Sequence, residues 1–506
     1  MADVAIQQAD LTKTARSKSV QDHIDERPIW PDGTILPSAP MTGMQWLIWS
    51  LAAAGKFFEG FVVFMTGVAL PLLSREFDIG TAQHGVIGAA SLFGILVGAV
   101  LLGGLSDRYG RKSMFVIEMV IFCAFLVALC FVTSYVQLVI CLLGLGLALG
   151  CDYPTAHMII SENIPSINRG KLVLAAFAFQ AVGALAGTGV GYLVLSTLPE
   201  ISAWRWMYAS AVIPAVLVTV GRFYIVESAN WLHARGEIDR AEQAARKLLS
   251  RKPQYPSEIK LGEHRAAGSE HGSGGSFMAL FNSTNRRATI LASVPWFLQD
   301  LGTYGIGIFT PTILAAAVGG TSDHARSVAD VILQDIAAAK GAALITALLI
   351  FGIIFAVMLA DTVGRIALQI LGFIGCAVGL FLASLASNFT GGTQLLLIFA
   401  GFMLFNFMTN LGPNAQTYLL AGEVFPTAIR GKGAGFAAAF AKIGAVLTAF
   451  LFPILLDEIG TTALLYGLIV ASLLGALVTW AFRIETTGVN LDDLESQTTA
   501  TEEKRA

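Results

Sequence analysis

The chain has 506 residues, of which 55% are hydrophobic and only 13% are charged. A soluble domain carries roughly a quarter charged residues, so this composition excludes an ordinary soluble protein. Apolar runs of about 20 residues, each long enough to cross the hydrocarbon core of a bilayer, recur along the sequence. The sequence therefore predicts an all-α membrane protein that crosses the bilayer many times. The net charge of −3 indicates no partner, because the charged residues lie mostly in loops and tails.

The order of polar and apolar segments predicts twelve spans in two bundles of six. Residues 1–43 form a polar tail that is too long and too mixed in charge for a secretory signal. A first bundle at 44–226 and a second at 288–483 flank a hydrophilic central loop at 227–287, and a polar tail covers 484–506. The expected spans are 45–73, 84–105, 113–132, 135–161, 171–195, 205–226, 288–317, 341–361, 366–386, 393–421, 431–457 and 461–483.

Lysines and arginines are concentrated in alternate connections. The central loop is rich in them, and the even-numbered connections hold Arg108, Arg111, Lys112, Arg169, Lys171, Arg365, Arg430 and Lys432. The other side has only Arg75, Arg205, Arg326 and Lys340. Because positive residues stay on the cytoplasmic side, we expect both termini and the central loop in the cytoplasm. The expected location is the plasma membrane, or the inner membrane of a bacterium.

Two stretches repeat each other in the two halves. GCDYPTAHMIISENIPSINRGK starts at Gly150, and GPNAQTYLLAGEVFPTAIRGK starts at Gly412. Both carry Glu, Pro, Ser or Thr, Arg, Gly and Lys at the same spacing, 261 residues apart. The repeat indicates a duplication, so we expect the protein to act between its two halves.

A second repeated motif follows the second span of each half. GGLSDRYGRK at 103–112 corresponds to LADTVGRI at 359–366. An acid at a helix end can interact with the N-terminus of a neighbouring helix, and the Gly–Arg turn supplies a partner charge. We interpret these loops as a cytoplasmic latch, with a plain positively charged loop as the alternative. The candidate gating residues are Asp107, Arg108, Gly110, Arg111, Glu162, Arg169, Asp361, Arg365, Glu423 and Arg430.

The central loop contains one amphipathic segment, GEIDRAEQAARKLL, from Gly236, followed by a flexible GSEHGSGGS run. The segment predicts a helix that either latches the two bundles together or fills a long linker in solvent. The five cysteines all lie in apolar segments and show neither a disulfide framework nor metal-ligand spacing. No GxxxxGK[ST] motif is present. We therefore expect no metal, cofactor, nucleotide or nucleic acid, and no enzyme activity.

The motifs, the duplication and the twelve spans together resemble the major facilitator superfamily. VESANWL at 226–232, GEVFPTAIRGKG at 422–433 and IETTGVNLDDLE at 484–495 resemble its sugar-porter-like branch. Within that branch GCDYP, WFLQDLGTYGIGIF, GPNAQTY and FAKIGA resemble the phosphate:proton symporters. The resemblance implies two six-helix bundles that rock about a central site. It also implies phosphate contacts at Tyr153, Gln180, Trp296, Asp300, Tyr304, Asn414 and Lys442.

The residues support a charged central site independently of the resemblance. Trp296, Asp300 and Tyr304 are spaced by four and share one face of a helix. An aspartate inside a span is costly unless it faces partners or water, and Lys442 is a natural counter-charge at similar depth. These groups predict a site for a small anion that travels with a proton. A static buried Asp–Lys pair is the alternative.

Four further intramembrane charges are present. Glu59 resembles the family's first-span carboxylate, and Asp152 is a second candidate for carrying protons together with Asp300. Lys56 is unexpected; it either pairs with Glu59 at i, i+3 or adds positive potential for a larger organic anion. The phosphate symporters usually carry a second acid where this chain has Val62. We assign Glu118 a structural role near the latch.

We therefore predict a secondary transporter that moves a small anion, phosphate or a small carboxylate, together with protons by alternating access. Its expected partners are the anion, protons and the bilayer, and we expect a monomer. A proton-driven exporter of organic or aromatic compounds is the alternative, and a nutrient sensor without net transport ranks below it. A sugar is disfavoured because PWFLQDLGTYG stands where sugar porters show a QQxSGxN-like run.

Overall fold

The structure is a computed structural model that describes residues 18–29, 33–36, 38–102, 105–251, 256, 258–261, 277–319, 328–426 and 429–486. Apart from one isolated bridge between Ile29 and Ile35, the regular elements of these ranges are helices. The all-α prediction is confirmed.

Six long helices form the N-terminal half: α3 (Gly43–Phe77), α4 (Thr81–Leu101), α6 (Arg111–Leu129), α7 (Tyr135–Asn163), α8 (Arg169–Thr197) and α9 (Ala203–Tyr224). The short helix α5 (Leu105–Tyr109) precedes α6. The start of α3 illustrates how sequence sets a helix end. Thr42 accepts a hydrogen bond from the backbone of Gln45, whose side chain caps the Thr42 N–H in return.

The C-terminal half contains α12 (Arg286–Gly319), α13 (Val328–Val363), α14 (Arg365–Ser384), α15 (Gly392–Leu411), α16 (Pro413–Glu423) and α17 (Arg430–Ala481). The tenth expected span is divided at Gly412, because its backbone leaves the helical region before Pro413 starts α16. The eleventh and twelfth spans run together in α17, which bends at Gly460 (φ 77°).

Ten helices among the described residues are long and apolar enough to cross a membrane, and the α17 stretch counts once among them. Because α17 contains the bend at Gly460, it comprises two of the expected spans. Helix α12 is not among the ten, since its centre carries Gln299, Asp300 and Thr303.

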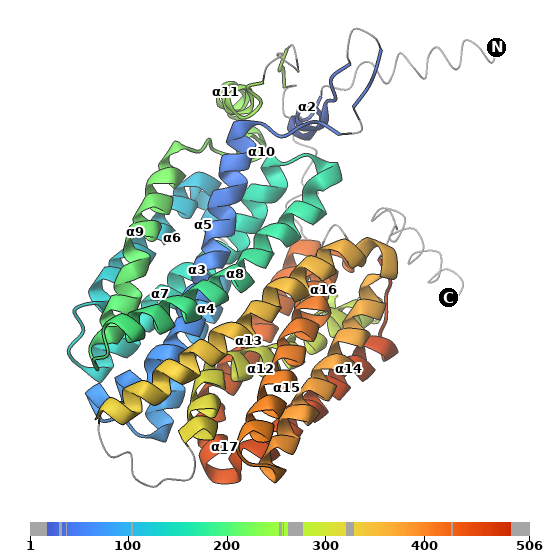
Figure 1. Cartoon of the computed structure of the whole chain (residues 1–506). Helices are drawn as coiled ribbons and strands as arrows, with labels where there is room; N and C mark the ends of the chain where they lie inside the picture. Colours follow the sequence, from blue (N-terminus) through green and yellow to red (C-terminus); the bar gives the residue numbers. More distant parts are fainter. Residues whose placement is uncertain are drawn as a thin grey trace, which may run out of the picture.

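The two halves lie side by side, and three short helices sit at one end of the molecule (Figure 1). These are α2 (Val20–Asp25), α10 (Ala229–Ala234) and α11 (Ile238–Leu248), and we call this end the tail side. Helix α11 buries Ala241, Ala245 and Leu248 and packs against α3 and α10. The amphipathic segment therefore docks on the N-terminal half; the flexible run after it lies outside the described residues.

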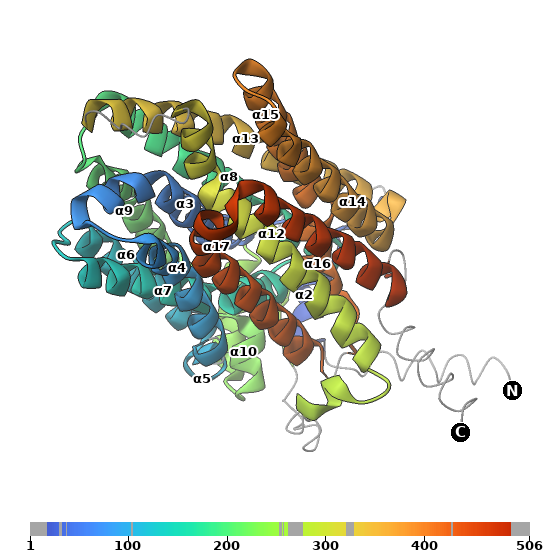
Figure 2. The same cartoon turned by 90° about the horizontal axis from the view of Figure 1, so that it is seen from below.

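The halves meet closely at the end opposite the tail side. Helix α4 packs along α17, α8 along α13, and α3 against α12 (Figure 2). Gly67 lies directly on the carbonyl group of Ile308, and Gly85 lies directly on that of Phe450. A Cβ at either glycine would overlap the facing backbone, so these glycines permit close packing between the halves. The opposite side is closed in this structure.

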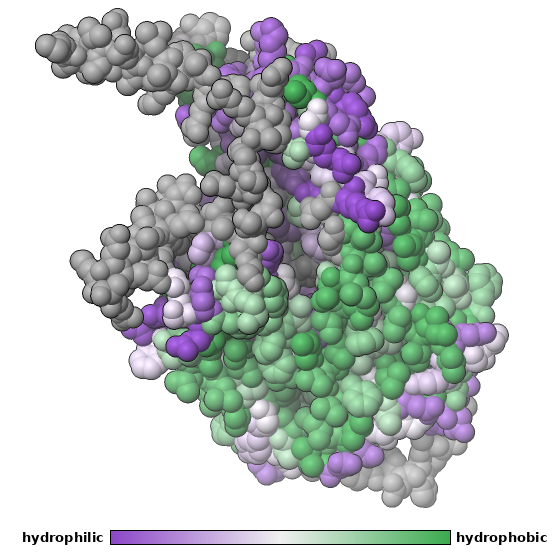
Figure 3. Space-filling view, turned by 180° about the vertical axis from the view of Figure 1, so that it is seen from behind, coloured by the Kyte–Doolittle hydropathy of each residue, from purple (hydrophilic) through white to green (hydrophobic). Residues whose placement is uncertain are grey.

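The surface fits a protein embedded in a bilayer. Figure 3 shows a broad hydrophobic surface over the long helices, with hydrophilic residues gathered at the tail side and in smaller patches at the opposite end. Exposed apolar side chains such as Phe131, Ile213 and Met358 contribute to it. Such a band would be costly in water and is expected where lipid chains cover it.

Candidate functional site between the two halves

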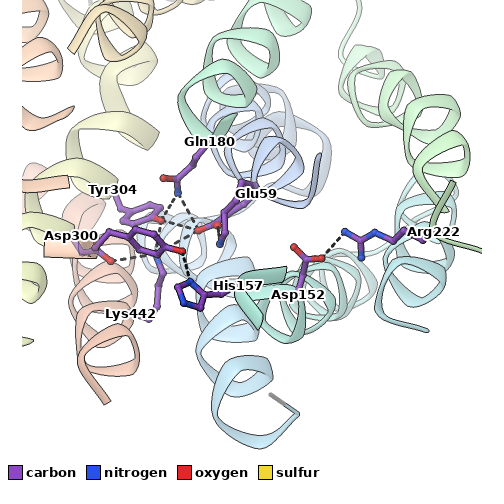
Figure 4. Close-up of polar contacts among 10 residues, drawn as sticks. Glu59, Asp152, His157, Gln180, Arg222, Asp300, Tyr304 and Lys442 are labelled. Atoms are coloured by element: carbon purple, nitrogen blue, oxygen red, sulfur yellow. Dashed lines mark hydrogen bonds and ion pairs between the residues drawn. The ribbon is translucent and has the colours of Figure 1, made fainter. Parts of the chain in front are cut away.

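A buried cluster of polar and charged side chains lies where the two halves meet (Figure 4). Its members are Lys56 and Glu59 of α3, Gln180 of α8, Asp300 and Tyr304 of α12, and Lys442 of α17. The ionisable side chains are at most 5% exposed. We call this set the central cluster.

The N-terminal half places a carboxylate at the interface. Lys56 Nζ lies 3.0 Å from Glu59 Oε2, so the predicted i, i+3 pair is formed. Gln180 Nε2 donates to Glu59 Oε1 and to the Tyr304 hydroxyl, both at 3.1 Å. Gln180 therefore joins a residue of each half.

The C-terminal half places a cation opposite that carboxylate. Lys442 Nζ donates to the Tyr304 hydroxyl at 2.6 Å and lies 3.4 Å from Asp300 Oδ2. It also lies 3.6 Å from Glu59 Oε1 across the interface. The Tyr304 hydroxyl donates to Glu59 Oε1 at 3.2 Å. One lysine thus contacts an acid from each half.

The charges of the central cluster balance when all its groups are ionised. Two lysines, Lys56 and Lys442, face two acids, Glu59 and Asp300. Buried charges are tolerated only when they are paired and hydrogen-bonded, which this arrangement achieves. Adding a proton to one acid leaves one net positive charge. The cluster can then accept a monoanion and remain neutral.

Aromatic rings line the tail side of the central cluster. The ring of Tyr418 from α16 stacks on Phe177 of α8 at 4.4 Å, and its hydroxyl lies 3.2 Å from His157 Nδ1 of α7. Trp296 meets the same ring edge-on at 6.1 Å. Tyr418 therefore links the two halves beside the site. Sequence reasoning did not select Tyr418, Phe177 or His157, although Tyr418 belongs to the GPNAQTY motif.

One of the predicted contacts, Asn414, lies elsewhere. Asn414 is 9% exposed and donates to Asn410 Oδ1 at 2.6 Å, beside the break at Gly412. No recorded hydrogen bond joins Asn414 to the central cluster among the described residues. The side chain of Tyr153 lies outside the described residues.

Asp152 points away from the central cluster in Figure 4. Its Oδ1 lies 2.6 Å from Arg222 Nη2 of α9, and Arg222 Nη1 lies 2.9 Å from Glu118 Oε1 of α6. All three residues are at most 4% exposed. Arg222 was not selected from the sequence. The signal that could have identified it is the position of an arginine near the end of an apolar span. Glu118, expected near the latch, belongs with this group.

The turns that repeat between the two halves form matching networks at the tail side, one within each half. Arg111 lies 3.0 Å from Glu162, and Arg365 lies 2.6 Å from Glu423. These pairs join α6 to α7 and α14 to α16, so each lies inside one half. Arg108 is exposed, and Arg169 donates weakly to Ser166 at 3.4 Å. The side chains of Asp107, Asp361 and Arg430 lie outside the described residues.

Each network contains a glutamate that sequence reasoning did not select. Glu227 accepts the backbone N–H of Lys112 at 3.0 Å, and Glu485 accepts those of Arg365 and Ile366 at 3.1 and 3.2 Å. The preceding glycines, Gly110 and Gly364, have φ of 102° and 97°. A side chain is strained at such angles, which explains glycine before both helices. The carboxylates stabilise the positive N-termini of α6 and α14.

Comparison with known proteins decides the family. Residues 48–497 match the family described as sugar (and other) transporter. The chain belongs to this family. It is a multi-pass membrane transporter with the major facilitator fold, and it is not an enzyme.

Curated relatives of this transporter carry several different cargo names. It is 29% identical over 453 residues to the putative metabolite transport protein YaaU of Escherichia coli K12, covering 89% of this chain and 94% of that protein. It is 27% identical to the probable inorganic phosphate transporter 1-12 of Oryza sativa subsp. japonica, covering 88% and 91%. It is 25% identical to the D-xylose transporter of Levilactobacillus brevis, covering 89% and 94%.

A solved structure shares the fold of this transporter. The partially occluded inward-open conformation of the xylose transporter XylE from E. coli superposes with a TM-score of 0.70 at 22% identity. The match covers 89% of this chain and all of that one. The twelve-span fold predicted from the sequence is confirmed.

Proposed function

We propose that this transporter carries a small anion, phosphate or a small carboxylate, together with a proton by alternating access. The observation that carries the proposal is Lys442, a buried cation in contact with Asp300, Glu59 and Tyr304. A neutral sugar needs hydrogen-bonding groups but no buried cation. An anion gains a charge-assisted hydrogen bond from the ammonium group, which is stronger than a neutral one.

The charge balance of the central cluster supports coupling to protons. An anion arriving alone would give a buried site a net negative charge, which is costly. An anion arriving with a proton on Asp300 or Glu59 leaves the site neutral. The same condition couples release of the anion to release of the proton. Lys56 and Lys442 would then hold the anion with Gln180, Tyr304 and, nearer the tail side, Trp296.

The tail side is assigned to the cytoplasm in this proposal, because Lys and Arg are concentrated in its loops. The closed opposite side supports a state occluded toward the outside. The location is the plasma membrane.

The direct test is uptake of radiolabelled phosphate into proteoliposomes under an inward proton gradient. We expect accumulation that collapses with a protonophore and that is lost in Asp300→Asn, while phosphate counterflow continues. Asp335→Asn, which changes a buried acid of α13 outside the central cluster, is the matched control. Full uphill uptake by Asp300→Asn would refute a coupling role for Asp300. If folded protein accumulates no phosphate, phosphate is excluded as the substrate.

The aromatic rings on the tail side of the central cluster favour a second candidate function, a proton-driven exporter of organic or aromatic anions. Tyr418, Phe177 and Trp296 offer ring faces next to the two lysines. Aromatic carboxylates would stack on these rings and place their charge at Lys442. Reversing the imposed proton gradient separates the candidates: export requires a gradient that drives protons opposite to the substrate.

A further inference from the structure

The N-terminal half holds a second buried cluster of ionisable groups. Arg222 lies 2.6 Å from Asp152 and 2.9 Å from Glu118. It also donates to the carbonyl oxygens of Phe115 at 2.7 Å and Leu51 at 3.3 Å, and it stacks on the Phe115 ring. We call Glu118, Asp152 and Arg222 the acid–arginine triad. These contacts hold the arginine in place from α3, α6 and α7.

The triad has more acid than base. Two carboxylates share one guanidinium group, and the three side chains are between 0% and 4% exposed. An uncompensated charge in such a place is costly. One carboxylate oxygen also lacks a partner, because Glu118 Oε2 is buried and receives no hydrogen bond within the described structure. The Glu118 and Asp152 carboxyl groups are held near each other because both contact the guanidinium group of Arg222. A proton on this pair would remove both the excess charge and the unpaired atom.

Lys56 connects the triad to the central cluster. It follows Gly55, whose missing side chain leaves room for the Asp152 carboxylate directly against α3. The Asp152 charge acts on the Lys56 ammonium group, which is bonded to Glu59 at 3.0 Å. The other titratable group facing Glu118 is the Cys151 thiol of α7. Among the described residues of the two clusters, Lys56 is therefore placed to interact with an acid of each, Glu59 and Asp152.

We propose that Glu118 and Asp152 share one exchangeable proton, and that Lys56 links its release to protonation of Glu59. While Glu59 is ionised, as its contacts here indicate, Lys56 neutralises it and the triad keeps its proton. When Glu59 takes up a proton, Lys56 neutralises Asp152 instead, and the O–H bond of the triad breaks to release its proton. The proton released by the triad offsets the proton taken up by Glu59, so the net number of protons moved in each transport cycle is the number carried by Asp300. The last statement rests on the proposed function; the proton site itself does not.

The proton site can be tested without any substrate. Infrared difference spectra of the full-length protein in vesicles, recorded across a pH titration, report the C=O stretch of protonated carboxyl groups. We expect a titrating band that Glu118→Gln removes and that Asp335→Asn leaves in place. Glu59→Gln should lower the pH at which this band disappears by about one unit, because it frees Lys56 for Asp152. In a Lys56→Gln background that response to Glu59→Gln should largely vanish.

The transport role needs a second measurement. The proton-to-substrate ratio, obtained from the membrane potential that balances a substrate gradient, should rise by one in Glu118→Gln, because release from the triad then no longer offsets the proton taken up by Glu59. Counterflow that persists in this variant shows that it is folded and binds substrate. An unchanged infrared spectrum in Glu118→Gln would overturn the proton site. An unchanged ratio with the band removed would overturn its role in transport. Failure to transport phosphate or carboxylates would refute the proposed function and leave the infrared result intact.

Discussion

The Tyr304 hydroxyl of α12 donates to Glu59 Oε1 of α3 across a distance of 3.2 Å, and this contact joins the two halves of the transporter. The same hydroxyl accepts from Lys442 at 2.6 Å and from Gln180 at 3.1 Å. One oxygen atom thus connects both halves to the cation that we assign to substrate binding. A substrate oxygen at this position would take over these hydrogen bonds. Contacts between the two halves would then be replaced by contacts to the substrate.

The hydroxyl of Tyr304 is the first test of this arrangement. Tyr304→Phe removes the hydrogen bonds that this hydroxyl makes to two charged groups, Glu59 and Lys442, and each such bond contributes about 1.5–3 kcal/mol. We expect apparent substrate affinity to fall roughly 10- to 100-fold in counterflow assays. Tyr208→Phe is the matched control, because Tyr208 is equally buried but bonds Thr66 within the N-terminal half. Equal affinities for both variants would exclude Tyr304 from the site.

Lys442 should be needed for stability as well as binding. Lys442→Gln leaves Asp300 and Glu59 buried without their shared cation, and breaking a buried pair costs about 3–5 kcal/mol. We expect a lower unfolding temperature in detergent and no measurable anion binding. The double variant Asp300→Asn/Lys442→Gln should recover most of the stability but not the binding. Additive losses of stability in the double variant would contradict the pairing.

Tyr418 should control opening of the tail side. Tyr418→Phe keeps the ring on Phe177 but loses the hydrogen bond with His157, worth about 0.5–1.5 kcal/mol. Tyr418→Ala loses both. We expect labelling of a cysteine introduced at the tail-side end of the interface between the halves to rise modestly in the first variant and strongly in the second. Identical labelling in both variants would show that stacking on Phe177 does not hold the two halves together.

Close packing at the opposite side predicts a way to trap the transporter. Gly67→Val would push against the carbonyl group of Ile308 and prevent closure there. We expect uptake to be lost while binding from the opposite side remains. Gly189→Val, a matched change in α8 where a Cβ meets open space, should transport normally. Normal uptake by Gly67→Val would mean that the interface between the halves accommodates the larger side chain.

The glutamates at the starts of α6 and α14 should stabilise each half independently. Glu485→Gln weakens the interaction with the N-terminus of α14, at a cost of about 1 kcal/mol. Glu227→Gln should do the same for α6. Because the two sites lie in different halves, we expect the losses in unfolding free energy to add. Strongly non-additive losses in unfolding free energy would show that the two networks are energetically coupled.

The fold and most members of the central cluster could be predicted from the amino-acid sequence. Apolar runs longer than a bilayer core and a repeat across two halves leave few arrangements, because every backbone polar group in lipid must be satisfied inside a helix. The predicted pair of Lys56 with Glu59 needed only the three-residue spacing of a helix. Asp300, Tyr304 and Lys442 were identified as charged or polar groups that a span tolerates only among partners.

The partners of these groups could not be predicted, because they depend on how the helices pack in three dimensions. Asp152 lies one residue from Tyr153 in the motif, yet it turns to Arg222 and leaves Glu59 to meet Lys442. Asn414 of α16 donates to Asn410 of α15 across the helix break at Gly412, and no hydrogen bond within the described residues joins it to the central cluster. Spacing along one helix gives the face on which a residue lies, but contacts between helices depend on how the helices cross and rotate. For that reason the triad of Glu118, Asp152 and Arg222, drawn from three helices, could be seen only in three dimensions.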